Sequence, residues 1–345
     1  MDEKLRFADL SDLLLDWYEA AARELPWRVG PKARARGVRA DPYRVWLAEI
    51  MLQQTTVPHA TRYYLAFTQR WQTVQDLAAA KDEDVMAAWA GLGYYARARN
   101  LLKCARAVRA LGAWPDTVEG LIKLPGIGPY TAGAIAALAF DRRAAAVDGN
   151  VDRVFARLLA MKGDWKTEKE RLKSVVEGLV PSDRPAEFAE GLMDLGATVC
   201  TPKSPNCLLC PLQCLCTACA EGTPERYPIK PKKAPKPKRH GHVFVALGSN
   251  RDVLTERRPE RGLLGGMLGL PTSEWSGMLA PAKFPIKADW QEVGEVRHVF
   301  THFALTLKVW RARGISSSSM TPRADAVDGL PSVFAKALAL AANDA

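Results

Sequence analysis

The sequence predicts a mainly α-helical chain that ends in a smaller α/β domain, and three observations lead to this expectation. Between residues 42 and 161, helical segments alternate with short glycine or proline breaks, without strand alternation. A proline- and lysine-rich segment, residues 226–240, then interrupts the chain. Beyond it, residues 242–247 and 304–310 have the apolar patterning of strands.

Length and composition set broad limits on the protein. A chain of 345 residues is too long for one ordinary core, which predicts two or three domains. The net charge of +10 favours a polyanionic partner, although many proteins are mildly basic without one. No apolar run approaches the roughly 18 residues of a membrane span, and no secretory signal is visible. We therefore expect a protein that stays in the cytoplasm, with no membrane partner. We also expect it to be a monomer.

The flanking elements follow the same patterns. Residues 5–25 show helical periodicity, and their apolar side is formed by Leu10, Leu13, Leu14 and Trp17. Residues 30–41 contain four basic side chains and are expected to form an exposed loop, either a solvated insertion or a DNA contact. Residues 164–198 continue as helices. Proline at the density of residues 226–240 predicts an extended, semi-rigid linker, so residues 241–345 should form a separate domain.

A glycine-rich turn joins two helical stretches at residues 124–133, LPGIGPYTAG. Gly126 and Gly128 let the backbone approach a ligand closely, and Pro129 suits the first turn of the next helix. Exposed N–H groups at such a helix start can bind an anion, which on DNA is a phosphate. An ordinary corner between two helices explains the turn equally well.

Six of the seven cysteines fall between residues 200 and 219, which indicates a metal site before disulfides in a cytosolic chain. Four have the spacing C-x6-C-x2-C-x5-C, namely Cys200, Cys207, Cys210 and Cys216. Four thiolates can hold zinc or a [4Fe–4S] cluster, and the spacing does not decide between them. The remaining Cys214 and Cys219 leave the fourth ligand ambiguous.

Two carboxylates stand out as candidates for chemistry. Glu49 shares a helical face with Val45 and Trp46, and a carboxylate among apolar neighbours should have the raised pKa of a general acid. The alternative is a surface glutamate on a half-exposed helix. Asp148 precedes a helical run in VDGNV, where its common role is a helix N-cap. Capping and catalysis can coexist at Asp148.

Residues 91–100, GLGYYARARN, combine a glycine turn with two tyrosines and two arginines. Such a set suits wedging into bases or stacking on them, beside contacts to the DNA backbone. The alternative is a loop with at least one tyrosine packed inward.

Taken in order, LAEIMLQQT, GLGYYARARN, LPGIGPYTAG, VDGNV and the four-cysteine run resemble the MutY branch of the helix–hairpin–helix DNA glycosylases. The resemblance covers about residues 8–220. Residues 262–271 and 298–303 look like the family's Nudix-like recognition domain. The acidic helix of a catalytic Nudix box is missing, since only Glu274 follows closely, so we expect no nucleotide hydrolysis.

The resemblance implies a domain order and a cofactor. It predicts a six-helix module at about residues 42–147, a [4Fe–4S] domain from residues 1–41 and 148–225, and a Nudix-like domain at residues 241–345. It also favours the [4Fe–4S] cluster over zinc, and its ligands would be Cys200, Cys207, Cys210 and Cys216.

The resemblance further implies a DNA glycosylase that removes adenine mispaired with 8-oxoguanine or guanine in double-stranded DNA. Glu49 would protonate the flipped adenine, and Asp148 would stabilise the positive sugar, as in glycoside hydrolysis. Asn150 and Tyr130 would position Asp148 and the sugar. Bifunctional relatives carry a Schiff-base lysine where this chain has Tyr130, so base removal without strand cleavage is expected.

Gln54 and Tyr94 match the family positions that fill or wedge the gap left by the flipped base. The DNA-binding set implied by the resemblance is Gln53, Gln54, Tyr94, Arg97, Gly126, Gly128 and Thr131. In the C-terminal domain, the opposite base would be read by Phe300, Thr301 and His302.

Two other interpretations stay open. One is an endonuclease III-like or mismatch thymine glycosylase. Tyr130 argues against the endonuclease III-like enzyme, and the added C-terminal domain argues against both. A non-catalytic iron–sulfur DNA-binding module is disfavoured because a pure binder needs neither Glu49 nor Asp148.

Overall fold

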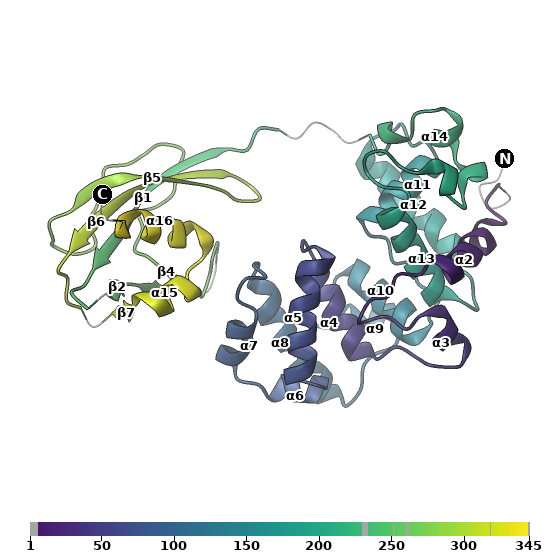
Figure 1. The fold of residues 1–345 in the computed structure, drawn as a ribbon, viewed down its shortest axis with the longest axis horizontal. Coiled ribbons are helices and arrows are strands. Elements are labelled where there is room, and N and C mark those ends of the chain that lie inside the picture. The colour runs from purple at the N-terminus through teal and green to yellow at the C-terminus, as the bar shows by residue number, and fades with distance from the viewer. Residues whose placement is uncertain (1–5, 230–233, 251, 260–261, 318, 344–345) are drawn as a thin grey trace. The chain divides into compact units, whose positions relative to one another are not determined.

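The protein was analysed as a computed structural model that describes residues 6–229, 234–250, 252–259, 262–317 and 319–343 (Figure 1). The chain divides into two compact units, residues 1–232 and 233–345, and each has its own hydrophobic core. Linker residues 230–233 and the first five residues, which the sequence analysis used, lie outside the described part.

The first unit is helical, as the sequence predicts. The middle of the chain contributes α4 (Pro42–Leu52), α5 (Val57–Arg70), α6 (Val74–Ala79), α7 (Asp82–Ala88), α8 (Ala96–Leu111), α9 (Val118–Leu121) and α10 (Pro129–Phe140). The N-terminal segment and the part after α10 contribute α2 (Leu10–Ala21), α3 (Pro31–Ala35), α11 (Gly149–Leu158), α12 (Trp165–Leu179), α13 (Pro185–Thr198) and α14 (Thr217–Ala220). Short 3-10 turns lie around the cysteines and beyond: η1 (Cys207–Leu209), η2 (Gln213–Leu215) and η3 (Pro224–Arg226).

Helix α10 is the central element of this unit. Its sequence is rich in alanine, and residues 131–139 are all buried, as expected for a helix that is apolar all round. It packs against α4, α9 and α13. At Gly133 an added Cβ would lie 2.3 Å from the backbone oxygen of Ala145, so this position has no room for a side chain. Small residues therefore let the elements around α10 approach closely.

The glycine-rich turn connects α9 to α10, as expected for a helix–hairpin–helix. Gly126 has φ +77°, a left-handed conformation that favours glycine, and its Cβ would lie 2.7 Å from Asn100 Cβ. Gly128 is the N-cap of α10 and Pro129 occupies the first turn, where the missing N–H costs nothing.

The second unit contains a five-stranded sheet of order β5-β6-β1-β2-β7. Its strands are β1 (Lys238–Leu247), β2 (Asp252–Leu254), β5 (Gln291–Val299), β6 (Ala304–Arg313) and β7 (Met320–Pro322), and a separate pair is formed by β3 (Glu256–Arg257) and β4 (Leu268–Gly269). The central pair β1–β6 is parallel, and β5–β6, β1–β2 and β2–β7 are antiparallel. The strands predicted at residues 242–247 and 304–310 are thus confirmed as β1 and β6.

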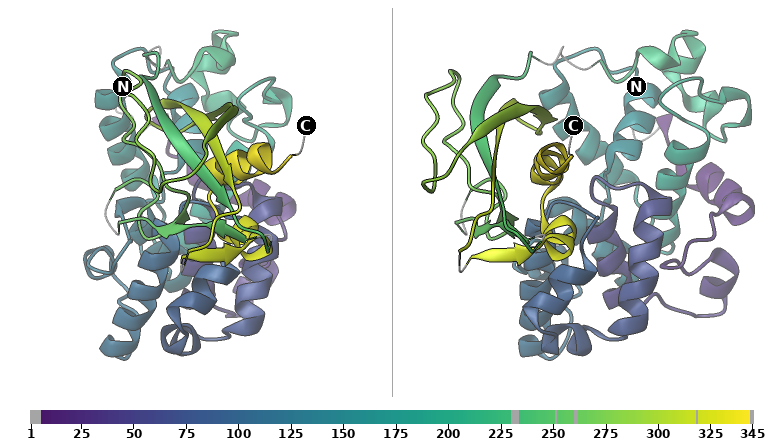
Figure 2. Two further views of the ribbon diagram at one scale, coloured as in Figure 1. Left: turned by 90° about the vertical axis from the view of Figure 1, so that its left-hand side faces the viewer. Right: turned by 60° about the vertical axis from the view of Figure 1, so that its left-hand side comes forward.

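The two faces of the sheet are covered differently (Figure 2). Val243 and Val245 of β1 share a core with Phe334 of α16 (Ser332–Ala342), and α15 (Arg323–Gly329) packs on β2 and β7. On the other face, Phe244 makes edge contacts with Phe284 and Trp290. Residues 271–290 form no helix, so the position expected for an acidic Nudix helix holds an irregular segment.

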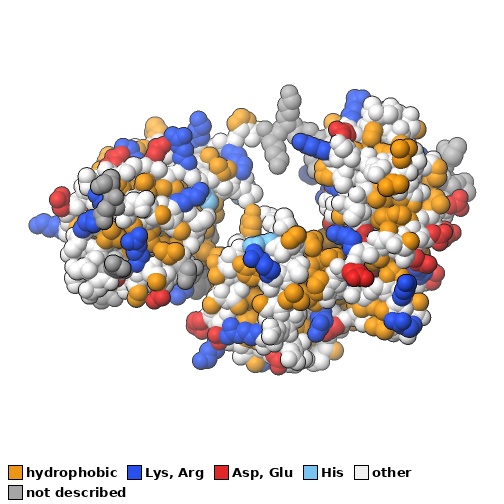
Figure 3. Space-filling view, in the orientation of Figure 1, with side chains coloured by type: hydrophobic (Ala, Val, Ile, Leu, Met, Phe, Trp, Pro, Cys, Tyr) orange, Lys and Arg blue, Asp and Glu red, His pale blue; other side chains and the backbone are white. Residues whose placement is uncertain are grey.

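The surface matches a mildly basic protein. Figure 3 shows Lys and Arg side chains over both units, with Asp and Glu between them, rather than one continuous basic patch on this face. Within the described part of the chain, no helix is both long and apolar enough to cross a membrane.

Candidate active site

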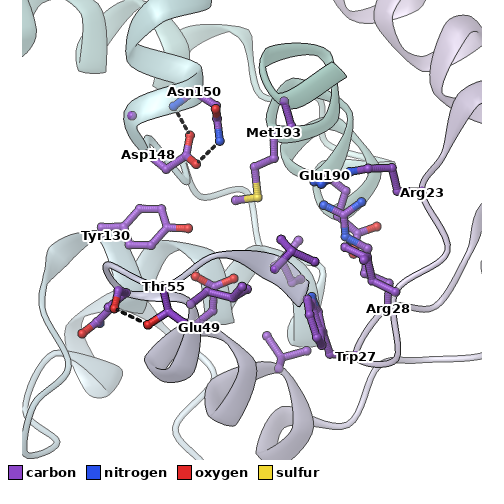
Figure 4. Close-up of a pocket in the computed structure, with 18 of the residues that line it drawn as sticks. Arg23, Trp27, Arg28, Glu49, Thr55, Tyr130, Asp148, Asn150, Glu190 and Met193 are labelled. Carbon is purple, nitrogen blue, oxygen red and sulfur yellow. Dashed lines mark hydrogen bonds and ion pairs between the residues drawn. The ribbon is translucent and has the colours of Figure 1, made fainter. Parts of the chain in front are cut away.

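A pocket of about 390 Å³ in the helical unit brings together the four residues predicted to be catalytic, and the predicted DNA-binding residues Gln53 and Gln54 also line it (Figure 4). Glu49 comes from α4, Tyr130 from the first turn of α10, and Asp148 and Asn150 from the start of α11. Met193 of α13 closes another side. Segments roughly 100 residues apart in the sequence thus converge on one cavity.

Glu49 is buried on α4, and its residue exposure is only 7%. Burial raises the pKa of this carboxyl to about 7, a hydrogen bond from the Tyr130 hydroxyl opposes that shift, and the negative charge of Asp148 adds to it. The alternative interpretation, that Glu49 is a surface glutamate on a half-exposed helix, is therefore wrong. Near neutral pH, this group can hold a proton or release it, as a general acid requires.

Asp148 is the N-cap of α11, as the capping interpretation predicts. Its Oδ1 accepts from the backbone N–H groups of Asn150 and Val151, both at 2.8 Å, and its Oδ2 accepts from Asn150 Nδ2 at 2.8 Å. Behind Asn150, a Cβ added to Gly196 would lie 2.6 Å from Asn150 Cβ, which leaves that amide little freedom. The carboxylate is thus held rigidly and still faces the pocket (Figure 4).

A buried ionic network that the sequence did not reveal lies at the wall of the same pocket. Arg28 Nη1 donates to both oxygens of Asp194 at 2.7 Å, and Arg23 Nε donates to Asp194 at 2.6 Å. Glu190, one helical turn before Asp194 on α13, accepts from Tyr18 at 2.8 Å. The sequence did contain a signal for this network. Glu190 and Asp194 lie four residues apart on a largely apolar helix, and buried carboxylates need cationic or hydrogen-bonding partners.

The basic segment of residues 30–41 only partly matches the expected exposed loop, since Lys32, Arg36 and Arg39 are exposed but Arg34 is not. Residues 31–35 form α3, and Arg34 is buried. Its guanidinium donates to the Leu138 carbonyl at 2.9 Å and lies 3.9 Å from Glu190 and 3.4 Å from Asp141. Arg34 therefore extends the network behind the pocket and is not available to DNA.

Two predicted DNA-binding residues have an unusual backbone. Gln54, after α4, has φ +57°, and Tyr94, before α8, has φ +50°. Left-handed conformations cost free energy for residues other than glycine and concentrate at functional sites. Both side chains are exposed, and Tyr94 exposes 52% of its surface. Its neighbour Tyr95 is half-buried, as the inward-packing alternative expects.

The other predicted DNA-binding residues differ in exposure. Gly126 and Gly128 lie at the accessible turn before α10. In contrast, Thr131 is buried and accepts a 3.4 Å hydrogen bond from Gln53. Arg97 donates to the Ile50 carbonyl at 2.9 Å and to other backbone oxygens, so it holds the loop in place from within.

Five cysteines line a second, smaller cavity, which we call the cysteine cavity: Cys200, Cys207, Cys210, Cys216 and Cys219. Among the described residues, no three His, Cys, Asp or Glu side chains are arranged to hold a single metal ion. Arg157 donates to Cys200 Sγ at 3.2 Å, and backbone N–H groups bond the thiols of Cys210 and Cys216. Several thiols around one cavity, with N–H donors, fit an anionic iron–sulfur cluster.

In the second unit, Phe300, Thr301 and His302 lie on the turn between β5 and β6, as predicted. Thr301 and His302 are exposed, whereas the Phe300 ring stacks on Trp275 with centroids 5.9 Å apart. Lys236 Nζ donates to the Phe300 carbonyl at 2.7 Å, which holds the turn against the start of the unit.

Comparisons with known proteins agree with this description. A profile of the HhH-GPD superfamily base excision DNA repair protein matches residues 47–180, and a NUDIX domain profile matches residues 242–340. The solved structure of a thermostable thymine-DNA glycosylase is similar, with a TM-score of 0.56 at 28% identity, over 64% of this chain and all of that one. An endonuclease III–DNA covalent intermediate, at 24% identity and a TM-score of 0.53, shares the fold.

Curated relatives match both units. The adenine DNA glycosylase of Mus musculus is 35% identical, covering 88% of this chain and 72% of its own length. The adenine DNA glycosylase of Buchnera aphidicola from Schizaphis graminum is 35% identical, covering 86% of this chain and 85% of its own length. Fold and site together define a helix–hairpin–helix base-excision repair protein with a Nudix-like C-terminal domain. More narrowly, the chain belongs to the adenine DNA glycosylase family.

The burial of Glu49 predicts a pH-dependent effect on stability. From about pH 4.5 to 7 the unfolded chain loses this proton while the folded chain keeps it, so the free energy of unfolding falls as pH rises. Glu49→Gln removes this penalty. The stability of the variant relative to wild type should therefore increase between pH 5 and pH 8, by up to about 3 kcal/mol.

Urea unfolding at both pH values, followed by circular dichroism, measures the difference. Glu83→Gln, at an exposed position on α7, controls for the general loss of a carboxylate. A Glu49→Gln difference that stays constant with pH would show that Glu49 is not a buried, proton-holding group.

Proposed function

We propose that this protein hydrolyses the N-glycosidic bond of adenine mispaired with 8-oxoguanine or guanine in duplex DNA, leaving an abasic site. The observation that carries the proposal is the pair of carboxylates in one pocket. Glu49 has a pKa of about 7 because it is buried, while Asp148 accepts three N–H hydrogen bonds. In glycoside hydrolysis, two carboxylates in different environments take different roles: one acts as the acid and the other stabilises the positive charge on the sugar.

The proposed reaction begins with extrusion of adenine from the duplex, at a cost of a few kcal/mol. The protonated Glu49 carboxyl donates its proton to a ring nitrogen of adenine, which makes the base a better leaving group. As the bond to the sugar breaks, the sugar becomes positively charged, and the Asp148 carboxylate stabilises that charge or forms a transient adduct. Water then attacks the anomeric carbon.

The remaining residues would hold these groups in place. Asn150 orients Asp148 directly through its 2.8 Å hydrogen bond. Tyr130 hydrogen-bonds to Glu49, so we now assign it to that carboxylate rather than to Asp148. Arg28 and Glu190 line the same pocket, but they are already paired with Asp194 and Tyr18 and would form a fixed polar wall beside the base.

On the DNA side, we propose that Gln54 and Tyr94 enter the space that the flipped base leaves, because both are exposed and held in left-handed conformations. The N–H groups at the start of α10 would bind a phosphate, and Gly126 and Gly128 let the DNA backbone approach. The DNA-binding surface would be supported from inside the protein by Gln53, Arg97 and Thr131. As a monomer on chromosomal DNA, the protein would be found with the nucleoid.

The hairpin position that carries a lysine nucleophile in bifunctional relatives holds Tyr130 here. A phenol cannot form a Schiff base with the sugar, so strand cleavage is not expected. This distinguishes the proposal from an endonuclease III-like activity.

We further propose that the cysteine cavity holds a [4Fe–4S] cluster through Cys200, Cys207, Cys210 and Cys216. When bound, the cluster would cross-link the chain from the end of α13 to the start of α14 through its Fe–S bonds. None of the steps above passes through it. In this arrangement residues 1–225 carry out excision, residues 226–240 act as a linker and residues 241–345 read the opposite base.

The role of Asp148 can be separated from its capping role. In Asp148→Asn the amide oxygen can still cap α11, since Asn caps as well as Asp, but an amide cannot offset a positive sugar. Single-turnover adenine release from an A:8-oxoguanine duplex should fall by at least about 100-fold, a loss of roughly 3 kcal/mol, while the melting temperature hardly changes.

The same assay tests the activity itself. Wild-type protein should release adenine from A:8-oxoguanine and A:G duplexes and leave the strand intact until alkali is added. Release of thymine from T:G instead, or full activity of Asp148→Asn with an unchanged melting temperature, would refute the proposal.

The second unit is proposed to read the opposite base through Thr301 and His302, the exposed members of the turn. Replacing both by alanine should reduce the preference for A:8-oxoguanine over A:G, at about 1–3 kcal/mol per lost base contact. The ratio of single-turnover rates and affinities on the two duplexes measures this preference. Arg297→Ala, an exposed change on the neighbouring β5, is the matched control. An unchanged ratio in the double variant would place recognition in the helical unit.

A further inference from the structure

The cysteine cavity contains one thiol more than a four-ligand cluster uses. Cys219 lines it together with the four proposed ligands, whereas Cys214 is exposed and lies outside the lining. The two cysteines that the sequence left unassigned are therefore not equivalent in the structure.

N–H donors hold three of the four proposed ligands. Arg157 Nη1 lies 3.2 Å from Cys200 Sγ, and the backbone N–H of Leu212 bonds to the Cys210 thiol. Two backbone N–H groups of α14 bond to the Cys216 thiol. Such donors fix the direction of a sulfur ligand and favour its thiolate.

Cys207 differs from these three ligands, because its thiol lies beside the thiol of Cys219, with which it shares the lining of the cavity. Cys207 belongs to η1, where the next residue, Leu208, is 86% exposed. Cys219 lies on α14, whose backbone also bonds to Cys216, so the helix that holds one ligand also holds Cys219 beside the cavity.

We propose that Cys219 is a reserve ligand that replaces Cys207 on the cluster. The inference rests on the proposed [4Fe–4S] site. In the exchange, the Cys207 sulfur leaves an iron and takes up a proton, while Cys219 loses its proton and binds the same iron. No electron is transferred, and the cluster keeps four thiolate ligands.

The test compares iron and inorganic sulfide per chain, and visible absorbance, in proteins purified without oxygen. Wild type, Cys214→Ser and Cys219→Ser should each hold about four irons. Cys207→Ser should keep most of its iron because Cys219 takes over. Cys210→Ser should lose its iron because Cys219 lies beside Cys207 and cannot take the place of Cys210. The double variant Cys207→Ser/Cys219→Ser should lose its iron because only three of the lining thiols remain.

Alkylation by iodoacetamide, mapped by mass spectrometry, identifies the ligand directly. In iron-loaded Cys207→Ser, Cys219 should be protected until the iron is chelated, whereas Cys214 should react at once. The inference is overturned if Cys207→Ser loses iron, or fails to accumulate, to the same extent as Cys210→Ser, or if Cys219 reacts while iron is bound. A wild-type protein without iron would instead refute the proposed cluster itself.

Discussion

The site depends on one physical constraint, the burial of the Glu49 carboxylate without a cation bound directly to it. Removing a carboxylate from water disfavours its charged form, and this is what raises its pKa to about 7. The Tyr130 hydroxyl opposes the shift and keeps the proton available rather than permanently bound. The nearest strong cation, Arg28, is largely committed to Asp194 and Glu190.

The rest of the helical unit serves this arrangement. Helix α4 carries Glu49 and packs on the alanine-rich α10, which contributes Tyr130. The N-terminus of α11 holds Asp148 through N–H donors, and α13 supplies the buried acids that pair with the arginines. Because α10 also begins at the hairpin turn, the element proposed to bind phosphate is continuous with the pocket wall. Packing, the proposed anion binding and the proposed acid chemistry thus depend on one helix.

Much of this could be predicted from the sequence, because the signals are local. The apolar neighbours of Glu49, the capping pattern at Asp148 and the glycines at residues 126 and 128 each reflect contacts within a few residues. The network of Arg28 with Asp194 could not be predicted, since 166 residues separate the partners. The burial of Arg34 and the inward direction of Arg97 were missed for the same reason. A basic residue looks exposed until its distant partners are known.

The second unit shows the same limit. Apolar patterning identified β1 and β6, but their parallel pairing joins segments more than 60 residues apart, and no local pattern encodes it. The missing acidic helix was visible in the sequence, because only Glu274 follows closely after position 271. The sequence could not show that Cys219 lines the cysteine cavity while Cys214 does not, because this depends on how α14 is oriented toward the cavity.

The central claim is that Glu49 acts in its protonated form, and the pH dependence of kcat/KM for adenine release tests it most directly, since this constant reports groups of the free enzyme. The account predicts that kcat/KM decreases above about pH 7, by roughly tenfold per pH unit. In Tyr130→Phe the midpoint should move to higher pH, because the lost hydrogen bond had lowered the pKa of Glu49. A profile that is flat from pH 6 to 9, or a midpoint that moves downward in Tyr130→Phe, would contradict the account.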